Sequence, residues 1–363
     1  MMMKKSIICA FLILVGLQPS LAQQRNEIKV PDLDGYKTLK CDFHMHTVFS
    51  DGLVWPTVRV DEAYREGLDA IALTEHIEYQ PHKKDINADH NRSYEICKKK
   101  ASDMGILLVK GSEITRPMAP GHSNAIFLQD SNPLDTKDYK DAYKAAKEQK
   151  AFIFWNHPGW DRQQPDSTKW WPEHTELYNN GCINGIEVAN GDVYSPEALK
   201  WCIEKKLTML GTSDIHEPIQ TDYDFAKGEH RTMTFVFAKE RSLDGIREAL
   251  DNRRTLVWYA DMVIGQEELM KPFFEKCIDI KEINRDEKGV TLSIMNNSDL
   301  IFKLHKTEHN PSLVYFRDYT LKPHTKHTIK ILFNDGIKGG DMNFEITNLI
   351  TYPEKGLNYT IKL

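Results

Sequence analysis

The sequence lacks the long apolar runs, cysteine pairs and basic clusters that mark several large classes of protein. No segment after residue 22 reaches the run of about 18 apolar residues that spans a bilayer, which excludes a polytopic membrane protein. The 47 basic residues are fewer than the 53 acidic ones and form no Lys/Arg-rich run, so nucleic-acid binding through phosphate contacts is not expected. A small phosphorylated substrate remains compatible with this charge, because bound metal ions supply local positive charge.

Cysteine is too sparse and too irregular for a disulfide framework. The chain has six cysteines without a Cys-x-x-Cys motif, and one of them, Cys9, lies in the N-terminal apolar segment. The cysteines after that segment are odd in number. The sequence leaves open a single bridge between Cys182 and Cys202.

The first 22 residues have the pattern of a cleavable signal peptide. Lys4 and Lys5 precede an apolar segment at 7–17, and Ser20 and Ala22 are small residues at the two positions that a signal peptidase reads. We expect cleavage near Ala22 and a periplasmic or secreted protein with no membrane span after processing. The alternative is an uncleaved N-terminal anchor, which the shortness of the apolar segment disfavours.

Length and pattern indicate two folded units after a short linker. Residues 23–36 are polar and linker-like, and residues 37–265 alternate strand and helix patterns in the manner of an α/β barrel. From 276 to 363, short alternating runs are separated by Asn, Asp and Gly turns. This pattern predicts a small antiparallel β-sandwich of the immunoglobulin-like class.

Residues able to bind metal follow strand after strand in the first unit. The opening strand, at 39–46, has a period of two that puts Asp42, His44 and His46 on one face. Two imidazoles side by side on a strand end chelate zinc or iron. Further candidates stand in the following turn or at later strand ends: Asp51, His76, Glu113, His122, His157, Asp214 and His216. Since a parallel barrel presents its active site at the carboxyl ends of its strands, we expect these side chains to converge.

These residues form motifs that resemble those of the polymerase-and-histidinol-phosphatase (PHP) superfamily. In family order the motifs are Asp42-Phe-His44-Met-His46-Thr47-x-x-Ser50-Asp51-Gly52, Thr74-Glu75-His76, Gly111-Ser-Glu113-Ile-Thr115, Gly121-His122, Asn156-His157-Pro158 and Ser213-Asp214-Ile-His216. The resemblance covers about residues 37–260. It implies a distorted (β/α)7 barrel of the α/β class that hydrolyses phosphoesters with two or three divalent metal ions. The sandwich lies outside it.

The resemblance also implies how the ligands divide among the ions, with Glu113 bridging the first two. The three sets are His44, His46, Glu113 and Asp214; Glu113, His122 and His157; and Asp51, His76 and His216. Such donors accept zinc, manganese or iron.

Four more residues are candidates for supporting the chemistry. Glu75 and Asp42 are predicted to orient ligating imidazoles. Arg116 and Arg231 are candidate phosphate clamps, with an ordinary ion pair as the alternative.

The motifs together predict a phosphatase or phosphodiesterase that cleaves a small phosphorylated molecule by attack of a metal-activated water. Tryptophans near the His157 motif are expected either to wall a ring-bearing substrate or to pack in the core: Trp155, Trp160, Trp170 and Trp171. Two alternatives stay open. One is a multinuclear hydrolase of a non-phosphate bond, and the other is a carbohydrate- or protein-binding module built on the sandwich, whose partner the sequence does not name.

Overall fold

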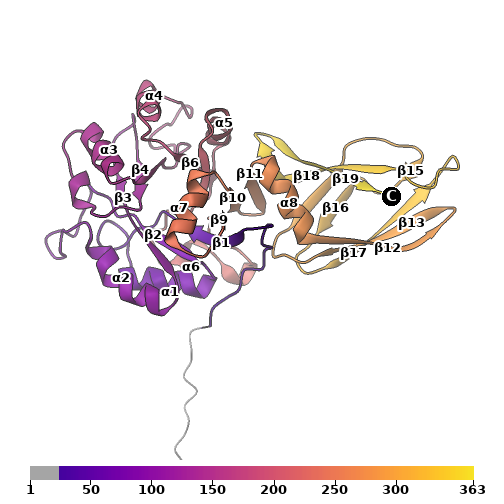
Figure 1. The fold of residues 1–363 in the computed structure, drawn as a ribbon, viewed down its shortest axis with the longest axis horizontal. Helices are drawn as coiled ribbons and strands as arrows, with labels where there is room; N and C mark the ends of the chain where they lie inside the picture. The colour runs from indigo at the N-terminus through magenta and orange to yellow at the C-terminus, as the bar shows by residue number, and fades with distance from the viewer. Residues whose placement is uncertain (1–23) are drawn as a thin grey trace, which may run out of the picture.

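The computed structural model describes residues 24–363, so the signal peptide predicted for residues 1–22 lies outside the described part. A barrel and a β-sandwich lie side by side, with strand β11 (Met262–Gly265) and helix α8 (Glu267–Cys277) at their junction (Figure 1). Among residues 24–363, no helix is both long enough and apolar enough to cross a membrane.

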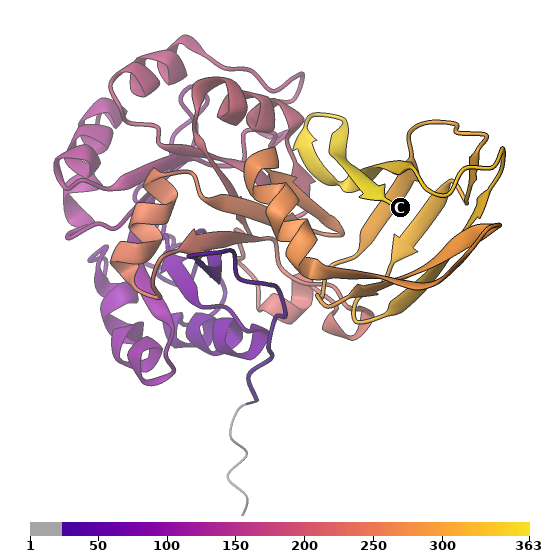
Figure 2. The same ribbon diagram turned by 45° about the vertical axis from the view of Figure 1, so that its right-hand side comes forward.

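The barrel alternates strands with helices, which lie around the outside of the strands (Figure 2). Its strands before β11 are β1 (Lys37–Asp42), β2 (Ala70–Leu73), β3 (Leu107–Ile114), β4 (Ser123–Ile126), β5 (Phe152–Trp155), β6 (Gly185–Asn190), β7 (Val193–Tyr194), β8 (Thr208–Thr212), β9 (Met233–Ala238) and β10 (Thr255–Tyr259). Its α-helices are α1 (Pro56–Glu66), α2 (Arg92–Asp103), α3 (Tyr139–Glu148), α4 (Pro172–Asn179), α5 (Pro196–Lys205), α6 (Ile219–Asp222) and α7 (Leu243–Asp251), and its 3-10 turns are η1 (Asn132–Leu134) and η2 (Phe225–Lys227).

Parallel and antiparallel pairs are mixed in this barrel. Strands β1, β2 and β3 run parallel, as do β5, β6 and β8, whereas β4 is antiparallel to both β3 and β5. Strand β9 is antiparallel to β1. The barrel closes just beyond the ends of β1 and β8, where Met45 and Ile215 form a parallel bridge and Asp214 N donates to His44 O at 2.9 Å. This closure places the segment that carries His44 and His46 next to the segment that carries Asp214 and His216.

Strand β8 packs against β9 and β10 without a regular ladder. A Cβ on Gly211 would lie 2.2 Å from Cγ1 of Val257, so the close approach of these strands requires glycine. The Thr234 hydroxyl accepts from Gly211 N at 2.9 Å and donates to Gly211 O at 2.8 Å. One side chain therefore satisfies both backbone groups of a buried residue.

The sandwich consists of two sheets. Its strands are β12 (Ile278–Asp286), β13 (Gly289–Asn296), β14 (Phe302–Lys306), β15 (Leu313–Val314), β16 (Asp318–Leu321), β17 (Lys326–Phe333), β18 (Asp341–Tyr352) and β19 (Lys355–Lys362). One sheet has the order β12-β13-β17-β15, and in the other β18 pairs with β14 and β19, and β14 with β16. Alternation along β17 buries Ile329, Ile331 and Phe333 between the sheets and leaves the intervening side chains exposed.

The two halves of the molecule share a sheet and a hydrophobic core. Strand β18 pairs in parallel with β11, with Val263 opposite Leu349. At the same junction Phe274 of α8 packs edge-to-face on Phe302 of the sandwich, with ring centroids 4.9 Å apart. Phe273 of the same helix packs on Phe235 of β9. Helix α8 therefore joins one continuous core rather than linking two separate ones.

The predicted α/β class with a C-terminal antiparallel sandwich is confirmed. The elements that were not predicted include helix α4, the β10–β11 hairpin and helix α8. The bridge left open between Cys182 and Cys202 does not form, because both residues are free thiols, as are the other cysteines of residues 24–363.

Candidate metal centre

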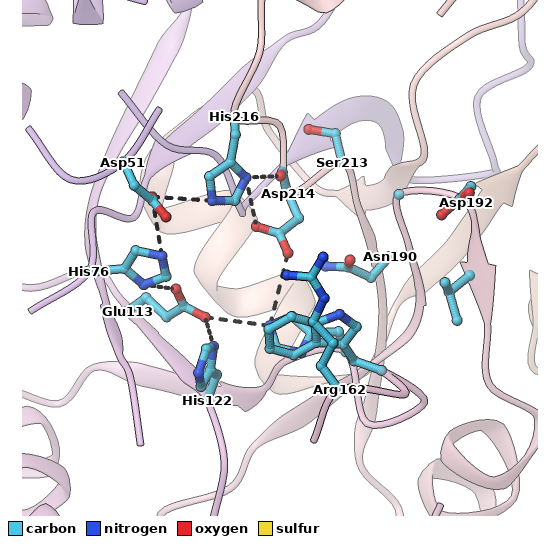
Figure 3. Close-up of a pocket in the computed structure, with 14 residues that line it drawn as sticks. Asp51, His76, Glu113, His122, Arg162, Asn190, Asp192, Ser213, Asp214 and His216 are labelled. Carbon is cyan, nitrogen blue, oxygen red and sulfur yellow. Dashed lines mark hydrogen bonds and ion pairs between the residues drawn. The ribbon is translucent and has the colours of Figure 1, made fainter. Parts of the chain in front are cut away.

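The structure brings all nine predicted ligands to one end of the barrel. Figure 3 labels six of them: Asp51, His76, Glu113, His122, Asp214 and His216. Strands β1, β2, β3, β5 and β8 end there, and β4 begins there because it runs in the opposite direction. The ligand atoms fall into three groups, each with its atoms within 4.8 Å of one another: His44, His46 and Asp214; Glu113, His122 and His157; and His46, Asp51, His76 and His216. These groups differ from the sets expected from the sequence in two members: Glu113 is not in the first group, and His46 belongs to the third group as well as the first. The metal-binding role of the nine residues remains a prediction.

The first group is built on the paired histidines beyond β1. The Nε2 atoms of His44 and His46 lie 3.1 Å apart, and each lies about as close to Asp214 Oδ1, at 3.0 and 3.1 Å. Both imidazoles are fully buried. Burial and the neighbouring His216 and His76 lower the pKa of His46 to about 3, so its imidazole is neutral, which is the form that binds a metal ion.

His44 is oriented by a residue that the sequence analysis missed. Its Nδ1 lies 2.8 Å from Oε1 of Glu187, a fully enclosed side chain on β6. The same carboxylate accepts from His157 N at 2.7 Å and from Thr212 Oγ1 at 2.6 Å. Glu187 therefore fixes members of two ligand groups at once. The sequence feature that could have identified Glu187 is its position as a charged residue inside the otherwise apolar strand 185–188.

His46 is oriented through an intermediate hydroxyl. Its Nδ1 lies 3.1 Å from Ser50 Oγ, which donates to Glu75 Oε2 at 2.7 Å. Glu75 also accepts from the backbone N–H and the hydroxyl of Thr47. The predicted support from Glu75 thus reaches His46 by way of Ser50, and it also fixes the turn that leads to Asp51.

Asp51 faces two histidines, His76 just after strand β2 and His216 just after strand β8. Its Oδ1 lies 3.3 Å from His76 Nε2 and 3.2 Å from His216 Nε2. The rings of His76 and His216 both stack on His46, with centroids 4.3 and 4.2 Å from its own and 6.1 Å from each other. Burial disfavours a charged His76, but Glu113 and Asp51 outweigh it and raise its pKa to about 10. The carboxylates therefore attract positive charge to this group.

Glu113 has an oxygen directed at each of two groups. Oε1 lies 3.0 Å from His122 Nδ1 and 3.6 Å from His157 Nε2, and Oε2 lies 2.5 Å from His76 Nδ1. The side chain is buried, yet His76 and His122 hold its pKa well below the usual range. A carboxylate can bridge two cations through its two oxygens, which an imidazole cannot do.

Among residues 24–363, several buried polar atoms form no hydrogen bond of regular geometry, and three of them are carboxylate oxygens of the candidate ligands. Asp51 Oδ1, Glu113 Oε2 and Asp214 Oδ1, one from each of the three groups, have imidazole nitrogens as their close neighbours. An unsatisfied buried acceptor is costly, and a divalent cation would satisfy it. The donor set of imidazoles and carboxylates fits zinc, manganese or iron. The residues present therefore fit the predicted metal ions.

Two of the candidate ligands have left-handed backbone conformations. The φ angle is 31° at His157 and 52° at Asp214. Such angles are strained for residues other than glycine and persist where surrounding bonds hold them. Here the backbone N–H of His157 is held by Glu187, and that of Asp214 by the carbonyl of His44.

A cavity of about 480 Å³ opens above the three groups. Besides candidate ligands, its lining includes Trp160, Arg162 and residues 190–193. Figure 3 shows the Arg162 side chain extending into the cavity. Arg162 was not predicted, because a loop arginine has no motif that distinguishes it from a surface residue.

The two arginines predicted as phosphate clamps lie elsewhere. Arg231 is completely buried, with nitrogens 3.0 Å from Asp42 Oδ2 and 2.5 Å from Glu66 Oε1. Arg116 pairs with Glu78 at 2.7 Å and donates to backbone carbonyls of the loop before α3. Neither residue lines the cavity, so the ion-pair alternative describes both of them.

Asp42 supports the site differently from the prediction. Its carboxylate accepts from the backbone N–H groups of His44 and Ser213 and from the Ser213 hydroxyl, and it pairs with Arg231. It therefore positions the two ligand-bearing segments through their backbone rather than through an imidazole.

The four tryptophans near the His157 motif differ in their surroundings. Trp160 lines the cavity, with its ring centroid 5.1 Å from that of His157. Trp155 is buried and stacks on Trp201, and Trp170 packs on both of these. Trp171, at the start of α4, is 37% exposed and bonds through its Nε1 to Gln164. Of the tryptophans named from the sequence, only Trp160 lines the cavity.

Comparison with solved structures gives a close match. A crystal structure from Bacteroides vulgatus, described as a two-domain protein containing a predicted PHP-like metal-dependent phosphoesterase, is 72% identical, with a TM-score of 0.94. The match covers 94% of this chain and 100% of that one. A putative metal-dependent phosphoesterase from Bifidobacterium adolescentis is 16% identical over 58% of this chain and 96% of its own, with a TM-score of 0.42.

Comparison with family models gives a match for the C-terminal sandwich. Residues 278–362 match a family model described as an Ig-like domain. No curated protein matches the chain.

Proposed function

The chain belongs to the family of PHP-like metal-dependent phosphoesterases, and from this premise we propose that it hydrolyses a phosphoester of a small molecule. The observation that carries the proposal is the convergence of three groups of imidazoles and carboxylates on one cavity, with Glu113 directed at two of them. The proposed ions are two or three of zinc, manganese or iron, bound by the nine residues in the groups described above.

Ions bound there would supply positive charge to the phosphoryl oxygens and lower the pKa of a coordinated water. The protein's own contribution is orientation. Glu187 and Ser50 fix the rings of His44 and His46, and Asp42 fixes the backbone of the segments that carry them. Ligands held in this way keep their geometry when substrate enters.

Arg162 is the residue proposed to bind the phosphate. It lines the same cavity as the candidate ligands, and its guanidinium lies 5.9 Å from the centroid of the Trp160 ring. A guanidinium pairs with phosphate through two parallel hydrogen bonds. Trp160 restricts the position of this side chain and shields the phosphate from water on that side.

The direct test is elemental analysis of the purified protein together with hydrolysis of p-nitrophenyl phosphate and bis(p-nitrophenyl) phosphate. We expect bound transition metal, loss of hydrolysis on chelation and recovery on adding the metal back. His44→Ala should lose both metal and activity, whereas the matched control His305→Ala, on an exposed sandwich strand, should keep both. Protein that binds no metal, and cleaves neither ester after reconstitution, would contradict the proposal.

Export to the periplasm or the medium is part of the same proposal. It is supported by the basic and apolar pattern of residues 4–17 and the small residues at 20 and 22. Expression of the full chain should give a periplasmic or secreted protein whose mature N-terminus follows Ala22. A cytoplasmic protein with an intact N-terminus would be the opposite result.

A further inference from the structure

A second cavity, of about 690 Å³, lies between the barrel and the sandwich. This volume is within the range of roughly 300–1,000 Å³ that is usual for small-molecule sites. Both halves of the molecule line it: Tyr223, Trp258 and Tyr259 from the barrel, and Asp299, Ile301 and Pro323 from the sandwich. Gly191 and Asp192 line both this cavity and the one above the metal centre. The two cavities are therefore neighbours across a single turn between β6 and β7.

This shared turn is held firmly in place. Gly191 N donates to Thr212 O at 2.9 Å, and Gly191 O accepts from Thr232 Oγ1 at 2.7 Å. The Tyr259 hydroxyl donates to Asp192 O at 2.7 Å. The turn thus forms a fixed border that the two cavities share.

The cavity has aromatic surfaces in its lining. The rings of His230 and Trp258 stack with centroids 3.6 Å apart, and His230 is fixed by the backbone carbonyls of Arg231 and Ala260, each 2.8 Å from a ring nitrogen. The Tyr259 ring is partly exposed beside them. Trp258 is only 8% exposed, so the aromatic surface open to a ligand comes from the partly exposed rings of His230 and Tyr259. Such surfaces pack against the C–H face of a ring-shaped ligand.

Carboxylates outnumber cations in the lining. Asp261 pairs with Lys303, Asp299 with His324, and Lys227 with Asp224. Asp192, Asp222 and Glu229 add further carboxylates. This lining has no cluster of cations for a second phosphate, and its carboxylates can accept hydrogen bonds from hydroxyl groups.

We propose that this cavity is a subsite for a neutral, hydroxyl-bearing ring of the sugar type, belonging to a substrate whose phosphate lies at the metal centre. The proposal rests on the proposed function and extends it to a substrate class. It gives the sandwich a role, because Asp299, Ile301 and Pro323 complete the wall of the subsite.

The test fills the cavity from the sandwich side with Ile301→Trp. Ile301 is partly exposed, and its carbonyl accepts from Asn348 Nδ2 at 2.8 Å, so the larger side chain is added to a fixed backbone position. The expected result is a fall of at least about tenfold in kcat/KM for glucose 1-phosphate relative to p-nitrophenyl phosphate, mainly through KM. The matched control is Ile283→Trp on the exposed face of β12, where the isoleucine is 54% exposed and the ratio should not change.

Phosphoethanolamine distinguishes a sugar subsite from a cation subsite. It carries the same phosphate on a short cationic group, and the proposal expects Ile301→Trp to leave its kcat/KM relative to p-nitrophenyl phosphate unchanged. A selective loss with phosphoethanolamine, or equal changes for all three esters, would overturn the proposal.

Binding of methyl glucoside separates this proposal from the proposed function. Ligand-observed NMR with the wild-type protein should show saturable binding that Ile301→Trp weakens and Ile283→Trp does not. This outcome supports the subsite even if no phosphoester is cleaved. Absence of methyl glucoside binding, together with an unchanged ratio of kcat/KM values in Ile301→Trp, refutes the subsite and leaves the phosphoesterase proposal untouched.

Discussion

Histidines at the mouth of the barrel and histidines of the sandwich have carboxylate neighbours at similar distances but different surroundings. His44 and His46 are fully buried and share Asp214. His305 and His324 have side chains that are 42% exposed, and each has one aspartate, at 2.6 and 2.5 Å. Within residues 24–363, every group able to hold a metal lies in the barrel. Proximity of an imidazole to a carboxylate is therefore not enough to form a metal site. Burial, shared carboxylates and unsatisfied acceptors distinguish the histidines of the barrel from those of the sandwich.

The largest effect is expected from removing the carboxylate that faces two groups. Glu113→Ala should lower kcat/KM by on the order of 10³ and reduce the metal bound per chain, because two ions lose a ligand. Elemental analysis and hydrolysis of p-nitrophenyl phosphate measure both changes. Asp318→Ala, which removes the partner of His305 in the sandwich, is the control and should change neither. Normal metal content in Glu113→Ala would show that Glu113 is not a ligand.

The buried ion pair of the barrel should matter more for stability than a surface pair of the sandwich. Arg231→Met leaves Asp42 and Glu66 buried without their cation, which typically costs about 3–5 kcal/mol. Urea unfolding of the metal-free protein should show this loss. Arg285→Met breaks the exposed pair with Glu282 on β12 and should leave the unfolding midpoint unchanged. Similar urea unfolding midpoints for Arg231→Met and Arg285→Met would show that the buried ion pair contributes no more stability than the exposed one.

A smaller effect is expected when the support of His44 is weakened. Glu187→Gln keeps the size of the side chain but removes its charge, and loss of such a supporting group typically costs about 10- to 100-fold in metal affinity or activity. Metal titration and kinetics report the change. Glu197→Gln, at the exposed start of α5, is the matched control. Wild-type affinity in Glu187→Gln would mean that His44 keeps its orientation without this carboxylate.

The most gradual effects, spread over several pH units, concern the pH dependence of stability in chelator-stripped protein. The pKa of His76 is raised to about 10, so its stabilising contribution is present below about pH 6.5 and is lost as pH rises through 10. The pKa of His46 is lowered to about 3, so stability falls as pH drops from about 6.5 toward 3, because only the unfolded state takes up the proton. Each contributes at most about 1.4 kcal/mol per pH unit.

Urea midpoints between pH 4 and 10 test both histidines. His76→Gln should flatten the alkaline side of the profile, and His46→Gln the acidic side, whereas His305→Gln should flatten neither. If both variants have the wild-type profile, other groups control the pH dependence.

The site residues that could be predicted from the sequence are those that lie close together in short motifs. His44 and His46, or Asp214 and His216, are two residues apart on extended chain, so their shared face follows from local geometry. The convergence of distant motifs followed from the resemblance to a known family and from the rule that barrel strands end together.

The rest depended on tertiary structure. Whether Arg231 faces the cavity or the core is decided by Asp42 and Glu66, which are far from it in sequence. Glu187 becomes a supporting residue only because the end of β1 lies beside β6 and β8. Helix α8 was missed because its apolar face is completed by Phe302, a residue of the other half of the chain.

The parallel pairing of β18 with β11 also limits how the chain can be divided. Strand β11 has β10 on one side and β18 on the other. A chain ending after Cys277 would expose the edge of β11, with the apolar side chains of Val263 and Ile264 beside unpaired backbone groups. Exposed edges of this kind recruit other strands and lead to aggregation. The sandwich therefore also covers an edge of the barrel sheet, and we expect the two units to fold together rather than separately.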